Sequence, residues 1–277
     1  MKNKEITICL PKGGVGKSVT AINLGFALAR TGQKVLLVDS DPQRGNMILK
    51  LGLSPDDLKQ TISNVIMAYL DEGDSNRAGS CIVNVAEGID LLPANPKLSA
   101  IQNRLIAERA SGGILEDETV ASEFVLKTIL APLKERYDTI IIDTSPSISM
   151  LAINALVAAD SVLIPMEAHY ESYEALTQIL DVVARIKAKL NPSLSIEGVL
   201  VTKYQNRTSL CRSIREMVEA EHGQAVRIFA DAVPYSIKAA EQAVHGVSIF
   251  EHDPANAVAQ AYSQLAAEIV KGGGLCG

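Results

Sequence analysis

The chain has 277 residues, of which 47% are hydrophobic, which is enough for one large α/β domain or two small ones and predicts a folded globular enzyme. Its net charge of −6 excludes a protein that coats nucleic acid over its whole surface, although a local basic patch remains possible. No segment approaches the roughly 20 consecutive apolar residues of a membrane helix, so we expect a cytoplasmic protein with no membrane partner.

Short strand-like runs alternate with longer helical patterns along the chain. The expected strands are 6–10, 34–39, 138–144, 161–165 and 196–202, with a weaker candidate at 89–93. The expected helices are 18–30, 120–136, 170–190, 209–222 and 255–270. Such alternation is typical of a twisted, mostly parallel sheet covered by helices on both faces. Because no Pro/Ser-rich linker divides the chain, we predict one α/β domain over 1–277, with a flexible tail at 272–277 and surface excursions within 54–118.

A glycine-rich loop follows the first expected strand. It reads Pro11-Lys12-Gly13-Gly14-Val15-Gly16-Lys17-Ser18, and a helix-compatible run begins at Val19. Glycines let backbone N–H groups turn toward phosphate oxygens, and the N-terminus of the following helix adds partial positive charge. We expect Lys17 to reach the β- and γ-phosphates and the Ser18 hydroxyl to bind Mg²⁺. The sequence therefore predicts ATP contacts by Lys12, Gly13, Gly14, Val15, Gly16, Lys17, Ser18 and Val19.

The strict pattern G-x-x-x-x-G-K-[ST] fails because Pro11 occupies the first glycine position, which leaves the variant K-G-G-V-G-K-S. This variant resembles the deviant P-loop family of ParA partition ATPases, MinD and the nitrogenase iron protein. The resemblance implies the deviant P-loop NTPase fold. It also implies that Lys12 acts catalytically across a dimer interface, on the nucleotide of the partner subunit, as an arginine finger does. Without the resemblance, Lys12 is equally well interpreted as a solvated loop lysine.

Three aspartates follow expected strands. Asp39 and Asp41 come after the second strand, at the carboxyl end where open α/β sheets bind ligands, and Asp143 ends the apolar run TIIID. The D-x-D-P-Q segment resembles that of ParA proteins, which implies that Asp41 positions or activates the attacking water and approaches the magnesium shell. The D-x-x-P segment resembles their Walker B segment, which implies that Asp143 holds a magnesium-bound water. From the residues alone, helix caps or turn residues are the better interpretation of Asp39 and Asp41.

The resemblance spans nearly the whole chain, through SVLIPMEAHYESYEAL and GVLVTKYQNRTSL. In ParA proteins the ends of the later strands flank the adenine, which implies adenine contacts by Lys203 and Pro234. Loop packing explains Pro234 equally well. Arg44 departs from the family pattern as an extra residue after D-x-D-P-Q, and this leaves the conformation of the segment and any contact by Asn46 open.

A basic stretch opposes the overall charge. Between Arg185 and Arg215 there are seven basic residues and one acidic residue, a local net charge of +6. Contacts between such side chains and phosphates give sequence-independent, salt-sensitive DNA binding, while a solvated helix face is an equally good interpretation. The predicted DNA contacts are Lys203, Arg207, Arg212, Arg215 and, by the resemblance of the tail region to ParA proteins, Lys238.

Three features of other family members are not found in this sequence, which limits the cellular roles that we expect. No cysteine lies between Cys81 and Cys211 to bridge an iron–sulfur cluster, and the last residues lack the basic amphipathic membrane helix of MinD. Only five residues precede the first strand, so we do not expect a helix-turn-helix or sequence-specific autorepression.

The residues and the resemblance together predict an ATPase that uses ATP and Mg²⁺, forms a homodimer on ATP binding, and binds DNA nonspecifically. We expect it to segregate plasmid or chromosomal DNA on the nucleoid and to be stimulated by a ParB-like or other cargo-bound protein. One alternative is a ParA-like ATPase that positions a protein cargo, such as a chemoreceptor array or a secretion apparatus. Another is a metabolic enzyme that uses ATP to activate a small substrate.

Overall fold

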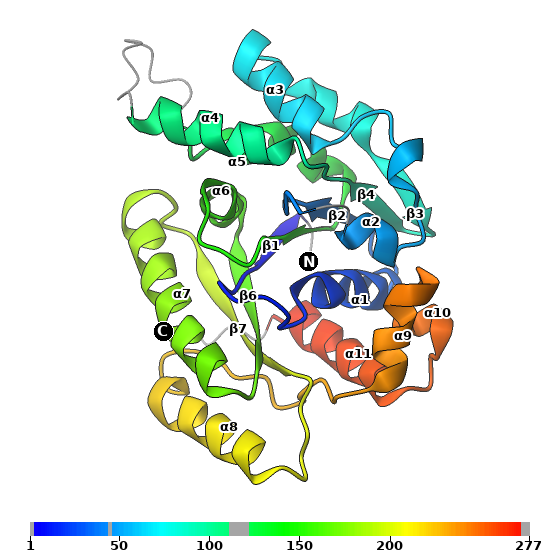
Figure 1. The fold of residues 1–277 in the computed structure, drawn as a ribbon, viewed down its shortest axis with the longest axis vertical. Coiled ribbons are helices and arrows are strands. Elements are labelled where there is room, and N and C mark those ends of the chain that lie inside the picture. Colours follow the sequence, from blue (N-terminus) through cyan, green and yellow to red (C-terminus); the bar gives the residue numbers. More distant parts are fainter. Residues whose placement is uncertain (1–2, 44–45, 111–121, 273–277) are drawn as a thin grey trace.

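The computed structural model describes residues 3–43, 46–110 and 122–272. These residues form one seven-stranded sheet with helices around it (Figure 1). The strand order is β3-β4-β2-β5-β1-β6-β7. The strands are β1 (Lys4–Ile8), β2 (Val35–Asp39), β3 (Val83–Ala86), β4 (Ile89–Leu92), β5 (Thr139–Asp143), β6 (Ser161–Glu167) and β7 (Ser195–Thr202). All neighbouring pairs are parallel except the β3–β4 hairpin. The predicted mostly parallel sheet is therefore confirmed.

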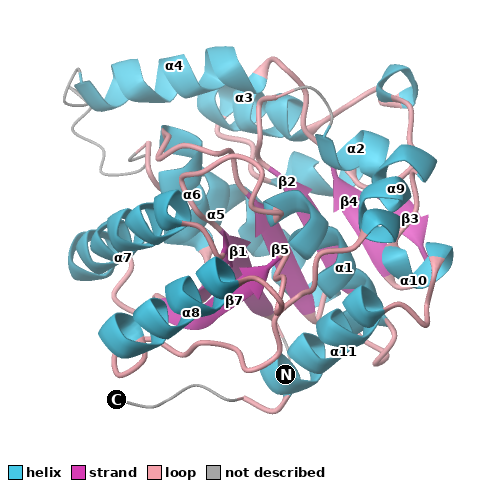
Figure 2. Ribbon diagram, turned by 60° about the horizontal axis from the view of Figure 1, so that its bottom comes forward, coloured by secondary structure: helices cyan, strands magenta, loops and turns pink. Residues whose placement is uncertain are grey.

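Helices cover both faces of the sheet (Figure 2). They are α1 (Lys17–Ala29), α2 (Asn46–Lys50), α3 (Ile62–Glu72), α4 (Leu98–Ala110), α5 (Val125–Leu130), α6 (Met150–Ala158), α7 (Tyr170–Lys189), α8 (Ser209–His222), α9 (Ile237–His245), α10 (Ile249–His252) and α11 (Ala257–Val270), with 3-10 turns η1 (Pro55–Asp57), η2 (Asn76–Cys81) and η3 (Ala131–Arg136). Helices α1, α2, α9, α10 and α11 pack on one face, and α3 to α8 pack on the other. Within the described residues, no helix is both long enough and apolar enough to cross a membrane.

Alternation along the strands explains this two-sided packing. In β2, Val35 and Leu37 join the core cluster of α1 and α11, whereas Leu36 and Val38 join the cluster of α3 to α6. All four side chains are fully buried, which is why β2 reads as a continuous apolar run rather than an alternating one.

Two stretches differ in detail from the prediction. The helix expected at 120–136 ends as an α-helix at Leu130 and continues as η3, because Pro132 has no N–H to donate to the preceding turn. The stretch 54–118, expected to hold surface excursions, contains α3, α4 and the β3–β4 hairpin, in which β4 confirms the weaker strand candidate at 89–93. Residues 111–121 and 273–277, the latter covering most of the predicted flexible tail, lie outside the described part of the chain.

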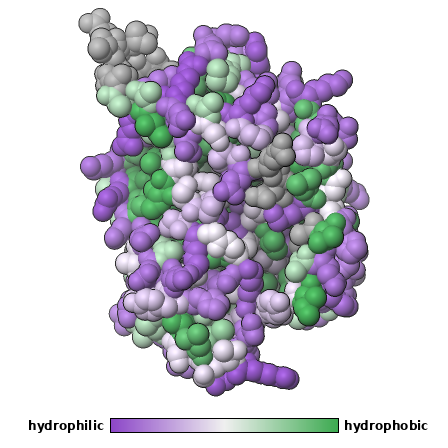
Figure 3. Space-filling view, in the orientation of Figure 1, coloured by the Kyte–Doolittle hydropathy of each residue, from purple (hydrophilic) through white to green (hydrophobic). Residues whose placement is uncertain are grey.

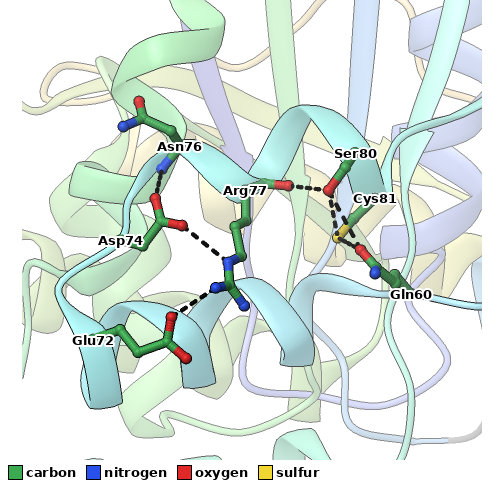
Figure 4. A network of polar contacts seen from close by, with 7 residues as sticks. All are labelled: Gln60, Glu72, Asp74, Asn76, Arg77, Ser80 and Cys81. Carbon is green, nitrogen blue, oxygen red and sulfur yellow. Dashed lines mark hydrogen bonds and ion pairs between the residues drawn. The ribbon is translucent and has the colours of Figure 1, made fainter.

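A polar network ties η2 to both ends of α3 (Figure 4). Arg77 Nε donates to Asp74 Oδ2 at 2.9 Å and its Nη2 donates to Glu72 Oε2 at 2.6 Å. The Ser80 hydroxyl donates to the Arg77 carbonyl at 2.8 Å and approaches Gln60 Oε1 at 3.3 Å. Polar side chains therefore connect η2 to the segments before and after α3.

Glu5 in β1 is a buried carboxyl at the amino edge of the sheet, opposite the strand ends described below. Its residue is 0% exposed, and Lys134 Nζ lies 2.5 Å from its Oε2. Burial raises the pKa of Glu5 to about 7, against the lowering effect of Lys134 and with a further rise from the charge of Asp160.

Glu5→Gln is expected to flatten the pH dependence of stability. Because the folded pKa of Glu5 lies above the ordinary value of 4.5, the folded state holds its proton longer, and the free energy of unfolding falls as pH rises from 4.5 to about 7. The wild type should lose up to about 3 kcal/mol over this window, and the variant should retain it. Urea unfolding at pH 5 and pH 8 measures the difference, with the exposed Glu87→Gln as the control. Equal pH dependence in Glu5→Gln and wild type would contradict the shifted pKa.

Candidate nucleotide site

The site lies at the carboxyl edge of the sheet, where three strands end at the same level. Strand pairing aligns Asp143 at the end of β5 with Ile8 at the end of β1 and with Asp39 at the end of β2. The chain continues from β1 to α1 on one face of the sheet and from β5 to α6 on the other face, and open α/β sheets bind ligands where neighbouring strands differ in this way.

The loop between β1 and α1 has the backbone expected of a phosphate cradle. Gly14 and Gly16 have φ angles of 81° and 88°, in the left-handed region that favours glycine. A Cβ at either position would meet no atom within 4 Å, so backbone conformation rather than space requires glycine. Gly16 also caps α1 without any side-chain hydrogen bond, which leaves the first N–H groups of the helix for an anion.

Thr202 at the end of β7 and the following Lys203 donate hydrogen bonds to two backbone carbonyls of this loop. Thr202 Oγ1 donates to the Val15 carbonyl at 2.8 Å, and Lys203 Nζ donates to the Gly14 carbonyl at 2.6 Å. In a trans peptide the N–H points opposite to the C=O, so the N–H groups of Val15 and Gly16 point away from β7. These N–H groups are thereby directed to bind an anion.

Lys17 is the buried cation of the loop. Its residue is 7% exposed, and its Nζ donates to the Lys12 carbonyl at 2.7 Å. Burial lowers the pKa of Lys17, and the charge of Asp143 opposes this effect. A phosphate bound here would replace the solvation that burial removes, so the position suits a phosphate-binding ammonium.

Lys12 lies on the same loop but pairs with a residue of another element. Its ammonium forms an ion pair with Glu171 in the first turn of α7, and the Glu171 side chain is 81% exposed against 22% for Lys12. An ion pair with so exposed a carboxylate contributes little to stability. Lys12 can therefore exchange this partner for another anion at low cost.

Asp143 is a buried carboxyl beneath the loop. Its residue is 1% exposed, and within the described residues neither carboxyl oxygen has a well-formed hydrogen bond. Burial raises the pKa of Asp143 to about 6, while the nearby Ser18 hydroxyl and Lys17 ammonium act in the opposite direction. A buried carboxyl in this state, next to a hydroxyl, fits a hydrated Mg²⁺ that also binds phosphate oxygens.

Asp41 is held in place by backbone amides at the end of β2. Its own N–H donates to Asp39 Oδ1 at 3.0 Å, and the Gln43 N–H donates to Asp41 Oδ1 at 2.9 Å. Burial raises the pKa of Asp41, and the Gln43 N–H opposes the rise. Burial, together with the charge of Asp143, also raises the pKa of Asp39. Arg44 and the side chain of Asn46, whose contacts the sequence leaves open, lie outside the described residues.

The two residues predicted to contact adenine lie side by side. The Tyr204 N–H donates to the Val233 carbonyl at 2.9 Å, and a parallel bridge joins Tyr204 to Pro234. This bridge places Pro234 beside the segment that follows β7, which begins with Lys203. The ammonium of Lys203 is, however, bonded to the loop and to Glu167 Oε1, at 2.6 Å in each case.

The predicted DNA contacts differ in their availability. Arg207 and Arg212 are exposed near the start of α8, where Arg212 Nη1 donates to the nearby Asn206 carbonyl at 3.0 Å. Arg215 is engaged, because it pairs with Glu219 at 2.8 Å, donates to the Ala230 carbonyl at 3.0 Å and packs over the Tyr204 ring. Lys238 forms an ion pair with Asp253 at 2.7 Å.

The remaining basic residues of the stretch lie at the other edge of the sheet. Helix α7 starts next to the end of β6 and runs back toward the start of β7, so Arg185 lies about 22 Å along the helix from Tyr170. The run of seven basic residues is therefore divided between two edges, and Arg207 and Arg212 are the exposed arginines at the edge of the nucleotide loop.

Sequence reasoning missed the partners that hold the loop from outside. Thr202, Glu167 and Glu171 were given no role, although Thr202 and Glu171 contact loop residues 187 and 159 positions away in the chain. No local motif carries this information, because the contacts exist only once β6 pairs with β1 and β7 pairs with β6.

Comparison with known proteins agrees with this geometry. The profile of a family described as an AAA domain matches residues 3–196. The sporulation initiation inhibitor protein Soj of Bacillus subtilis is 36% identical over 98% of this chain and 99% of its own length. The chromosome partitioning protein ParA of Caulobacter vibrioides is 32% identical over 96% of this chain and 94% of its own length.

A solved structure with a bound nucleotide has the same fold. The cobyrinic acid a,c-diamide synthase from Mycobacterium smegmatis with bound ADP and magnesium has a TM-score of 0.79 and 28% identity, covering 98% of this chain and 95% of that one. The fold is that of the ParA/MinD-type P-loop proteins. With full-length relatives above 30% identity, the chain belongs to the Soj/ParA family of P-loop ATPases.

Proposed function

We propose that this ATPase is a partition ATPase, which dimerises on binding ATP and Mg²⁺, binds DNA without sequence preference and segregates plasmid or chromosomal DNA. The observation that carries the proposal is the match of a chromosome partitioning protein over 96% of the chain. A ParB-like or other cargo-bound protein would stimulate hydrolysis, and the ATP-bound dimer would reside on the nucleoid in the cytoplasm.

In the proposed reaction each element of the site has a distinct task. Lys17 and the amides of the loop would bind the β- and γ-phosphates, while Ser18 and Asp143 would hold Mg²⁺ and its bound water. When bound, Mg²⁺ neutralises charge on the phosphate oxygens. Asp41, fixed by the Gln43 N–H, positions the attacking water.

The contact of Lys12 supports the dimer. In the single chain its ammonium is paired with exposed Glu171, so its departure from this partner costs little. Polyphosphate of a second subunit offers a more highly charged partner in an interface from which water is excluded. ATP held by one chain would thus recruit Lys12 of the partner subunit and stabilise the dimer.

Exposed Arg207 and Arg212 support DNA binding that depends on ATP. Both follow the end of β7, at the same edge of the sheet as the nucleotide loop. A dimer formed through that edge brings two copies of the pair onto one surface, and binding through both copies is stronger than binding through one. The single chain, with a net charge of −6, would bind DNA weakly.

Arg207→Glu combined with Arg212→Glu is expected to weaken DNA retention at least about tenfold and to flatten its salt dependence, because phosphate contacts are lost. Retention of purified protein on nonspecific DNA, with ATP, ADP or no nucleotide and at two salt concentrations, measures this. Arg185→Glu with Lys187→Glu is the matched control, with the same change of charge at the other edge. Retention of wild type only with ATP supports the proposal, and equal loss in both double variants would argue against the Arg207 surface.

Two other functions are separated by the same assay. Absence of DNA binding under every condition would favour a ParA-like ATPase that positions a protein cargo. Activation of a small substrate is the second candidate, because a structure of 28% identity carries the name of a diamide synthase. If the protein activates a small substrate, we expect ATP turnover to be stimulated by a carboxylic acid with an amine donor and to be unaffected by DNA.

A further inference from the structure

We propose that Lys203 and Glu167 are positioning residues, which together hold the phosphate loop in its anion-binding conformation. This role concerns ATP binding and does not depend on the partition role. It gives Lys203 a task different from the adenine and DNA contacts that its place in the sequence predicts.

The ammonium of Lys203 connects three neighbouring strand ends. Its Nζ lies 2.6 Å from the carbonyl oxygen of Gly14, in the loop after β1, and 2.6 Å from Oε1 of Glu167, the last residue of β6. Lys203 itself directly follows β7, and β6 lies between β1 and β7 in the sheet. Both distances are those of strong, charge-assisted hydrogen bonds.

The bonded carbonyl belongs to the peptide that most needs such a restraint. Gly14 has a φ of 81° and no side chain, so its backbone can adopt either sign of φ at little cost. Rotation of the Gly14–Val15 peptide would turn the Val15 N–H out of the cradle and bring a carbonyl oxygen in, where it would repel phosphate. Lys203 holds this peptide, and Thr202 holds the next one through the Val15 carbonyl.

The backbone of Lys203 is consistent with a fixed role. Its φ of 51° lies in the left-handed region, and within the described residues only Asn3 shares this property among residues other than glycine. Such a conformation costs free energy for a lysine and persists where the surrounding structure imposes it. Here the flanking residue is fixed, since the Tyr204 N–H donates to the Val233 carbonyl at 2.9 Å.

Glu167 makes the arrangement electrically neutral. Its carboxylate balances the charge of Lys203, with His169 Nε2 3.7 Å from the other carboxylate oxygen. The pair therefore acts through the shape of the loop rather than through attraction of phosphate, in contrast to buried Lys17. Pairing with Glu167 also reduces the availability of Lys203 for DNA.

Lys203→Asn in the full chain tests the inference. Asparagine tolerates the left-handed region, so the variant removes the ammonium without adding backbone strain. Inorganic tripolyphosphate with Mg²⁺ is the probe, because it has no base. We expect its dissociation constant, measured by calorimetry, to rise about tenfold, and those of ATP and GTP to rise by the same factor. The exposed Lys59→Asn is the control and should bind as wild type does.

Two further variants distinguish positioning from general damage. Lys203→Arg, which keeps a cationic donor, should recover most of the tripolyphosphate affinity. Glu167→Gln should weaken binding alone but add little to Lys203→Asn, since both act through one contact. Unchanged tripolyphosphate affinity in Lys203→Asn would overturn the proposal. In that case a loss of ATP relative to GTP would assign Lys203 to the adenine, and a loss of DNA retention alone would assign it to DNA.

Discussion

Lys17→Ala is expected to abolish tight ATP binding, with a dissociation constant at least about 100-fold higher than that of wild type. The side chain is a buried ammonium bonded to the Lys12 carbonyl, and its removal would delete the charge-assisted hydrogen bonds that we propose it makes to the phosphates. Calorimetry with a nonhydrolysable ATP analogue and Mg²⁺ measures the loss. Unchanged affinity would show that the loop is not the phosphate site.

Lys12→Ala is the matched control, because it removes a second lysine from the same loop. Its ammonium is paired with Glu171 rather than turned over the loop, so the single chain should bind the analogue within about twofold of wild type. Dimer formation with ATP, followed by light scattering, should instead be lost. Equal loss of affinity in both variants would place both lysines on the nucleotide of their own chain and contradict the trans role of Lys12.

Asp41→Asn is expected to bind ATP normally and to hydrolyse it about 10²- to 10⁴-fold more slowly, the range that loss of a general base gives. The amide keeps an oxygen at the Oδ1 position for the Gln43 N–H, so the segment should retain its shape while the charge is lost. Single-turnover phosphate release, measured beside analogue affinity, separates chemistry from binding.

Asp39→Asn is the control for that experiment. Asp39 is buried at the end of β2 and accepts the Asp41 N–H, and burial raises the pKa of Asp39. Asparagine keeps an oxygen for this hydrogen bond, so the segment should retain its shape. Turnover should remain within a few-fold of wild type. Comparable losses at the two positions would indicate a shared role in supporting the segment, and wild-type turnover in Asp41→Asn would remove Asp41 from catalysis.

The parts of the site that sequence predicts well are those encoded over a few consecutive residues. Lys17 and Ser18 open the helix that follows the first strand. Gly16, which precedes them, adopts a left-handed conformation that glycine reaches at little cost. Asp143 ends an apolar strand, and register then places it beside Ile8. Parallel strands bring their carboxyl ends together, so these predictions needed no knowledge of distant contacts.

Helix α3 and the distribution of the basic residues were not predicted. The sequence contains the signals for the helix, whereas the distribution of charge over the surface depends on the fold. Helix α3 has a capping box between Thr61 and Asn64 and ends at Gly73 with a φ of 72°, both readable in the stretch that was expected to hold surface excursions. The basic stretch, by contrast, is contiguous only along the chain. A helix of 20 residues carries its two ends to opposite edges of the sheet, so charge summed along the sequence overstates the charge of any one surface.

The buried carboxyl of Asp143 has a consequence for the lifetime of the protein. At neutral pH this carboxyl is mostly ionised and enclosed, and within the described residues it has no well-formed hydrogen bond, so its charge is destabilising unless a cation binds beside it. Ligand binding to the folded chain alone removes that defect and shifts the unfolding equilibrium in proportion to ligand concentration. We therefore expect resistance to unfolding, and with it resistance to proteolysis, to rise with the concentration of magnesium nucleotide.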